Sequence, residues 1–196
     1  RNSIKNMARA AKEMGFSYIG LSDHSQSARY AGGLNLEKLH QQWGEVAQVN
    51  KETDGFHIFK GIESDILPDG SLDYDETILK QFDFIIASVH SHFNMPLEDM
   101  TQRVAKALRN PYTTILGHPT GRLLLSREPY AIDMIRIIDE ASRTGVAIEL
   151  NAHPYRLDID WRLCKYAKTK GVKIAMNPDA HHEEGLKDTY VGVGFA

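Results

Sequence analysis

The chain has 196 residues, one cysteine and nine histidines, carries a formal net charge of −3, and is 42% hydrophobic. This length and apolar content predict one domain with its own core and exclude wholesale disorder, while the slight acidity disfavours a protein that coats nucleic acid. The lone Cys164 excludes an internal disulfide framework, and the apolar runs are strand-sized, so we expect a cytoplasmic protein with no membrane partner.

Helical and strand-like patterns alternate along the chain. Residues 4–14 carry apolar side chains at helical spacing before Gly15, and further helical patterns occupy residues 36–51, 97–108, 133–144 and 160–170. Short apolar runs typical of buried strands lie at residues 18–21, 56–62, 82–89, 113–116, 146–150 and 172–176. This alternation predicts an α/β fold with a parallel sheet and crossover helices.

Six strands are recognisable, and the sequence opens on a helix rather than a strand. We therefore expect one more strand before Arg1, which would bring the fold to seven βα units and close to a barrel. An open doubly wound sheet is the alternative, but no glycine-rich phosphate-binding motif follows the first strand.

Histidines and acidic residues follow the ends of successive strands. In parallel α/β folds the C-terminal strand ends meet at one rim, where active sites lie. A single histidine there is more often an ordinary loop residue, but the joint pattern favours a metal site. Imidazoles and carboxylates without thiolates suit Zn, Mn or Fe, and their number exceeds what one tetrahedral ion needs, which predicts two or three divalent ions. The expected ligands are His24, Glu63, His90, His118, Asp179 and His181.

Five short motifs follow one another along the chain: Ser-Asp-His-Ser at 22–25, Gly-Ile-Glu at 61–63, Ser-Val-His-Ser at 88–91, Gly-His-Pro at 117–119 and Asp-Ala-His at 179–181. In this order they resemble the motifs of the PHP (polymerase and histidinol phosphatase) domain. Longer strings at 23–34, 65–74 and 117–122 resemble the PHP domain attached to bacterial family X DNA polymerases. The resemblance implies a distorted (β/α)7 TIM-like barrel, a multinuclear metal centre and phosphoester hydrolysis, which in the polymerase is a 3′–5′ exonuclease activity.

Two departures from the family pattern concern the ends of the chain. The family's first motif, a His-x-His pair followed by an Asp, should precede Arg1, and a further helix should follow Ala196. We therefore expect residues 1–196 to be a single PHP metallophosphoesterase domain truncated at both ends. Asn151 and His153 are expected to lie behind the metal ligands or to face the substrate.

Arginine side chains are the expected phosphate ligands. Arg122 follows His118 by four residues, and its guanidinium fork can bind two phosphate oxygens. Arg29, Arg127 and Arg156 are weaker candidates, since each is also typical of a solvated surface charge.

Two residues are candidates for proton transfer or for orienting a ligand. His92 could donate a proton to the substrate or be an ordinary loop residue. Asp23 could fix the tautomer of His24 or cap a turn.

Three functions remain open from the sequence. The leading hypothesis is an exonuclease that acts on a DNA 3′ end and is covalently linked to polymerase domains. The alternatives are a small-molecule phosphatase of the histidinol-phosphatase kind and a non-catalytic scaffold domain of a polymerase.

Overall fold

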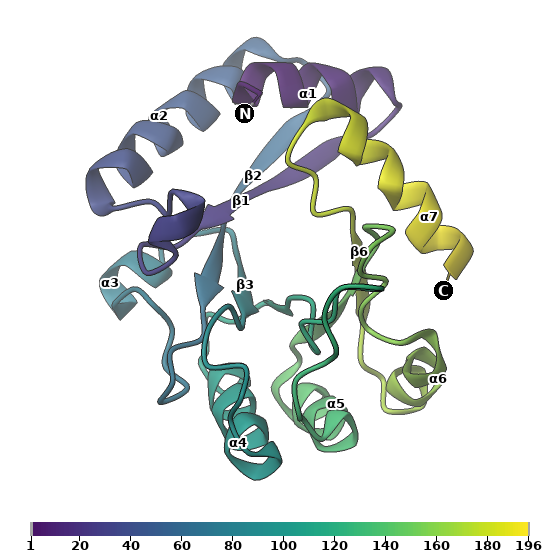
Figure 1. The fold of residues 1–196 in the computed structure, drawn as a ribbon. Coiled ribbons are helices and arrows are strands. Elements are labelled where there is room, and N and C mark those ends of the chain that lie inside the picture. The colour runs from purple at the N-terminus through teal and green to yellow at the C-terminus, as the bar shows by residue number, and fades with distance from the viewer. Residues whose placement is uncertain (1, 196) are drawn as a thin grey trace.

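A single curled sheet of six parallel strands organises the computed structural model, which describes residues 2–195 (Figure 1). The strands pair in chain order, and among the described residues β1 and β6 form the two edges. The strands are β1 (Tyr18–His24), β2 (His57–Asp65), β3 (Phe84–Ser88), β4 (Ile115–Leu116), β5 (Ala147–Asn151) and β6 (Ile174–Asn177).

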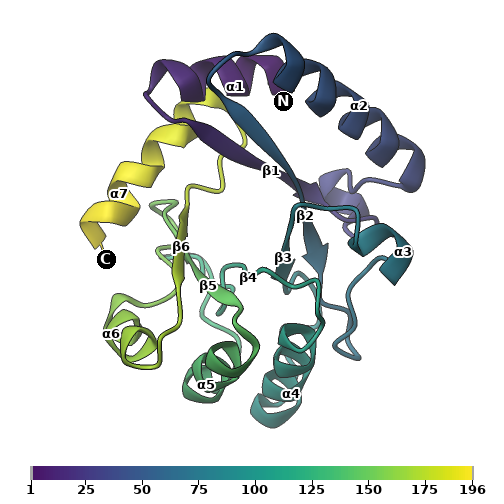
Figure 2. The same cartoon turned by 180° about the vertical axis from the view of Figure 1, so that it is seen from behind.

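Helices cover the outer face of this sheet, as the view from behind shows (Figure 2). Side chains of Asn35, Asp133 and Asp160 accept hydrogen bonds from backbone N–H groups in the first turns of three of them, which explains where these helices begin. The helical elements are α1 (Ile4–Glu13), η1 (Arg29–Ala31), α2 (Leu36–Glu52), α3 (Glu76–Leu79), α4 (Leu97–Leu108), α5 (Met134–Thr144), α6 (Trp161–Thr169), η2 (Glu183–Lys187) and α7 (Asp188–Phe195).

Strand periodicity separates a core face from a site face. Ile58 and Ile62 of β2 are buried in the core, whereas Gly61 and Glu63, which alternate with them, lie on the concave face. A Cβ at Gly61 would lie 2.2 Å from the ring of Phe84, and Gly20 on β1 meets the same ring. These two glycines make room for Phe84 inside the curl, and the next residues on that face lead to the site.

The sheet is a curled half-barrel, which confirms the predicted TIM-like α/β class. The five predicted helices and six predicted strands occur in the expected order, and α3 and α7 are further helices that the sequence patterns did not predict. A cavity of about 830 Å³ runs along the open side, lined by residues of both edge strands, including Leu21 and Met176. The strand expected before Arg1 lies outside the described residues. Within residues 2–195, no helix has the length and apolar character needed to cross a membrane.

Candidate metal centre

Four predicted metal ligands meet at the C-terminal ends of neighbouring strands. His24 is the last residue of β1 and lies opposite Glu63 in the register of β2. His90 follows the end of β3 by two residues, and His118 follows the end of β4 by two. Parallel pairing in chain order therefore brings these side chains to one rim.

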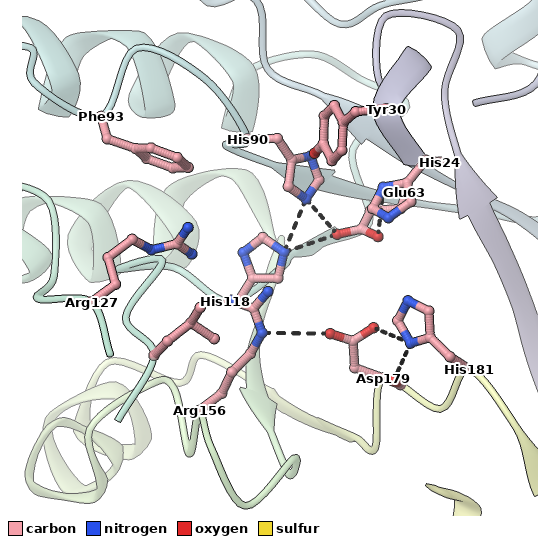
Figure 3. A pocket seen from close by; sticks show the side chains of 11 residues that line it. His24, Tyr30, Glu63, His90, Phe93, His118, Arg127, Arg156, Asp179 and His181 are labelled. Carbon is pink, nitrogen blue, oxygen red and sulfur yellow. Dashed lines mark hydrogen bonds and ion pairs between the residues drawn. The ribbon is translucent and has the colours of Figure 1, made fainter. Parts of the chain in front are cut away.

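The donor atoms of Glu63, His90 and His118 form a compact triangle (Figure 3). Glu63 Oε1 lies 3.2 Å from His90 Nε2 and 2.9 Å from His118 Nε2, and the two nitrogens are 3.3 Å apart. Ligands bound to one ion at about 2.0–2.1 Å are about 2.9 Å apart at right angles and about 3.4 Å apart in a tetrahedron. The triangle therefore has the dimensions of one divalent metal site.

His24 extends this group on the other oxygen of the carboxylate. Its Nδ1 lies 3.3 Å from Glu63 Oε2, and donor atoms of His24, Glu63 and His90 all lie within 4.8 Å of one another. This Nδ1 is buried and makes no hydrogen bond with any described residue. A buried nitrogen that makes no hydrogen bond, beside two further imidazoles and a carboxylate, fits a divalent metal ion.

Burial and neighbouring charges oppose each other in this cluster. Burial favours the neutral form of both Glu63 and His90, but their mutual contacts outweigh it. Hydrogen bonds from His118 and His90 hold the pKa of Glu63 well below its usual range. Asp65 and Glu63 raise the pKa of His90 to about 9, whereas burial lowers the pKa of His24.

Asp65 contacts the cluster directly, although the sequence patterns gave it no predicted role. Its Oδ1 lies 2.6 Å from His90 Nδ1, and its Oδ2 accepts a hydrogen bond from the Ser27 hydroxyl. A carboxylate on one ring nitrogen orients the imidazole and directs the other nitrogen towards a metal. The sequence feature that could have indicated this contact is the position of Asp65 two residues after Glu63, which puts both side chains on the same face of β2.

Glu149 on β5 is a second residue without a role in the sequence reading. Its Oε2 accepts a hydrogen bond of 2.6 Å from the backbone N–H of His118, and its Oε1 accepts one of 2.8 Å from Asn177. Burial raises the pKa of this carboxyl to about 7. An acidic residue inside the apolar run at 146–150 was the available signal.

Asp179 and His181 line the same pocket but contact different partners. Asp179 Oδ2 accepts a hydrogen bond of 3.1 Å from Asn151 Nδ2 and lies 3.6 Å from Arg156 Nε. His181 Nδ1 lies 2.9 Å from the Asp179 carbonyl oxygen, and the His181 side chain is largely exposed. Both residues lie within the pocket but beyond the triangle around Glu63 (Figure 3).

The guanidinium of Arg122 makes hydrogen bonds and an ion pair within the protein. It donates hydrogen bonds to the carbonyl oxygens of Arg156 and Leu157 and pairs with Asp160 at 3.3 Å. Among the described residues, the arginines that line the pocket are Arg127 and Arg156, and Arg122 does not line it.

The other predicted site residues lie outside this pocket in the described structure. His92 is exposed and contacts the Ser91 hydroxyl, and His153 Nδ1 accepts a hydrogen bond from the backbone of Tyr155. The Asp23 carboxylate accepts a hydrogen bond from Gln42 and borders the groove on the open side. Asn151 is fully buried and connects Glu149 with Asp179.

The pocket around the cluster has a volume of about 270 Å³. Besides the predicted ligands, aromatic, apolar and cationic side chains line one side of the pocket. The sequence patterns did not indicate that these side chains lie together. This side is formed by Tyr30, Phe93, Arg127 and Arg156 (Figure 3). Leu123 also lines it.

Comparisons with known proteins agree with the fold. The chain is 44% identical over 194 residues to the DNA polymerase/3′–5′ exonuclease PolX of Bacillus subtilis, covering 99% of this chain and 34% of that protein. It is 31% identical over 203 residues to a protein of Thermoanaerobacter sp. (strain X514) named a probable phosphatase, covering 95% and 78% of the two chains.

A solved structure has the same fold. The histidinol phosphate phosphatase of Lactococcus lactis, crystallised with zinc, L-histidinol and phosphate, superposes with a TM-score of 0.61 at 15% identity, covering 99% of this chain and 87% of the other. The PHP domain family matches residues 1–153. The match covers more than half of the chain and confirms the resemblance carried by its motifs: the chain belongs to the PHP domain family.

Proposed function

We propose that the chain is a metal-dependent phosphoester hydrolase that removes nucleotides from a DNA 3′ end. The observation that carries the proposal is the clustering of Glu63 and three histidines at one end of a pocket that also contains two arginines. The family membership and the 44% identity to a polymerase with 3′–5′ exonuclease in its name support the same reading.

The proposed centre holds two or three divalent ions, of Zn, Mn or Fe. The residues that would hold them are His24, Glu63, His90, His118, Asp179 and His181. Bound ions of this kind activate the attacking water and neutralise negative charge on the phosphoryl group and the leaving oxygen. Glu63 suits the centre because its two oxygens face different histidines, with Oε1 towards His90 and His118 and Oε2 towards His24.

Arg127 and Arg156 are proposed to hold the substrate phosphate. A terminal nitrogen of Arg156 is buried without a hydrogen-bond partner among the described residues, so an incoming phosphate oxygen would satisfy it. Arg127 uses Nε to bind the carbonyl oxygen of Gly121, and this contact aims the rest of its guanidinium at the pocket. Asn151 donates a hydrogen bond of 3.1 Å to the Asp179 carboxylate, which also lies 3.6 Å from Arg156 Nε.

The proposed partner is a set of polymerase domains in a longer chain. The chain spans 34% of the length of the B. subtilis polymerase, which therefore has further regions that could bind DNA. The proposed site itself would handle only the terminal nucleotide, for which a slightly acidic domain is sufficient.

A small-molecule phosphatase is the second candidate function. The relative named a probable phosphatase is covered over 78% of its length, and the solved structure with the same fold is a phosphatase crystallised with L-histidinol and phosphate. A small phosphomonoester and the terminal nucleotide of a DNA strand would both place one phosphate beside Glu63.

The test compares two substrates on the purified, Mn²⁺-loaded chain: a single-stranded oligonucleotide with a free 3′ end and histidinol phosphate. We expect stepwise shortening of the oligonucleotide and at least a roughly 100-fold loss of rate in Glu63→Gln, since the variant removes the charge that holds the cluster together. Glu98→Gln on the exposed surface of α4 is the matched control and should retain the rate. Hydrolysis of the phosphomonoester alone would favour the second candidate, and an active Glu63→Gln would refute the site.

A further inference from the structure

The metal-binding side of the pocket accounts for only part of its lining. Tyr30, Phe93 and Arg127 come from the segments that follow β1, β3 and β4, and they border the same cavity as the cluster around Glu63 (Figure 3). Binding a phosphate requires cations and hydrogen-bond donors but no aromatic surface. The aromatic groups therefore point to a second part of the ligand.

Tyr30 presents an exposed aromatic ring at the entrance to the metal centre. Its side chain is 75% exposed, and its ring centroid lies 6.5 Å from that of His24. An exposed tyrosine ring next to buried metal ligands offers a flat apolar surface on which a planar group can stack.

The backbone that carries Tyr30 is tightly folded. The N–H groups of Ala28 and Gly33 donate to the carbonyl oxygens of Ser25 and Ala28, and Gly32 adopts a φ of 76°. A Cβ on Gly33 would lie 2.0 Å from the Ser25 carbonyl oxygen, so only glycine permits this close approach. The backbone position of Tyr30 is thus fixed before a ligand arrives, which lowers the entropic cost of ordering this loop on binding.

A second planar group is built from Phe93 and Arg127. Phe93 stacks on the buried Tyr130, with ring centroids 6.0 Å apart and an angle of 16° between the planes. The guanidinium carbon of Arg127 lies 4.7 Å from the Phe93 ring centroid. A guanidinium that is oriented by an aromatic ring can itself stack on a planar ligand while its N–H groups contact phosphate.

We propose that Tyr30 and the Phe93–Arg127 pair bind a flat ring in the organic part of the substrate, namely the base of a terminal nucleotide, while its phosphate lies at Arg156 and the metal centre. The inference rests on the proposed function, because it assumes a phosphoester ligand at Glu63. It adds a specificity determinant: the site distinguishes a nucleotide from a bare sugar phosphate.

The test measures equilibrium binding of two reaction products and needs no turnover. Calorimetry on the Mn²⁺-loaded chain compares thymidine 5′-monophosphate with 2-deoxyribose 5-phosphate, which lacks the base. Base stacking on an aromatic side chain predicts tighter binding of the nucleotide, and Tyr30→Ala should weaken nucleotide binding about 5- to 100-fold without changing sugar-phosphate binding. Tyr30→Phe should retain the preference, since it keeps the ring.

Tyr18→Ala is the matched control, because Tyr18 is 62% exposed at the opposite end of β1. It should leave both affinities unchanged. The inference is refuted if the unaltered chain binds both ligands equally or binds neither, or if Tyr30→Ala keeps the preference for the nucleotide. Hydrolysis of the oligonucleotide, measured on the same preparations, tests the proposed function separately, since a preference in binding can persist without turnover.

Discussion

Glu63 carries more of the site than any other side chain, because one buried carboxylate accepts contacts from His24, His90 and His118. The outer contacts are equally specific: Asp65 orients His90, and Glu149 holds the backbone of His118. His118 has a φ of 23°, a backbone conformation that a non-glycine residue adopts only when its surroundings enforce it. The hydrogen bond from the His118 N–H to Glu149 helps to hold this conformation. The metal affinity should therefore depend on Glu149, although Glu149 is not itself a proposed metal ligand.

Glu149→Gln should weaken metal binding about 10- to 100-fold, the range for losing a partner that orients a ligand. The amide of glutamine brings donors to a position that faces the N–H of His118 and the side-chain amides of Asn177 and Asn151. The affinity is measured by competition with a chelator of known strength.

Glu140→Gln is the control for this experiment. Glu140 is also buried, but it pairs with Arg109 and Arg143 on the outside of the barrel. This variant should lose stability and keep its metal affinity. Equal metal affinities in the two variants would show that Glu149 has only a general structural role.

Two loops on the rim, after β4 and after β5, are joined by Arg122. Its guanidinium satisfies two backbone carbonyls of the second loop and pairs with Asp160, the N-cap residue of α6. The same loop carries Arg156 into the pocket. At the scale of elements, Arg122 therefore fixes the position of a site residue by holding its loop.

Arg122→Met should lower the free energy of unfolding by about 1–3 kcal/mol, because it leaves partly buried carbonyl groups without donors. Arg162→Met is matched to it, since Arg162 also pairs with Asp160 but is largely exposed, and it should cost less than about 1 kcal/mol. Urea unfolding of both variants measures the difference. A weaker substrate affinity with unchanged stability in Arg122→Met would instead assign Arg122 to phosphate binding.

Five of the six strands contribute to the proposed centre: His24 and Glu63 lie at the ends of β1 and β2, and the other proposed ligands follow β3, β4 and β6. In the metal-free cluster, His90 binds its proton more tightly than a free imidazole does. Its pKa of about 9 lies above the ordinary 6.5, because Asp65 and Glu63 outweigh the effect of burial. Folding and metal binding should therefore respond to pH in opposite directions.

In the metal-free chain we expect stability to fall as the pH rises from 6.5 to 9. The folded state binds the His90 proton more tightly than the unfolded state, so this stabilisation is complete below about 6.5 and is lost as the pH passes through about 9. The raised pKa of Glu149, about 7 against an ordinary 4.5, adds a decline in the same direction at lower pH.

A divalent ion should reverse the trend, because the ligands must lose protons to bind it and affinity therefore rises with pH. Urea unfolding at pH 6.5 and 9, with a chelator or with excess Mn²⁺, measures both slopes. A metal-free chain that is equally stable at both pH values would contradict the assignment.

Local patterns in the sequence determined the alternation of strands and helices, the parallel sheet and the position of His24, Glu63, His90 and His118 at or near the C-terminal ends of strands. These follow from periodicities of two and 3.6 residues and from the rule that parallel strands end at one rim. Helix bounds were within two residues of those observed, because the N-cap side chains and the glycine at 145 are local signals.

Only the tertiary structure decided which loop side chains reach the pocket. Arg122, Arg127 and Arg156 are alike in sequence, but Arg122 is held by carbonyls more than thirty residues away, which leaves Arg127 and Arg156 in the pocket wall. Tyr30 and Phe93 likewise join the site through loops from different strands. Loop side chains follow no period, so their direction depends on contacts between distant segments that no local pattern encodes.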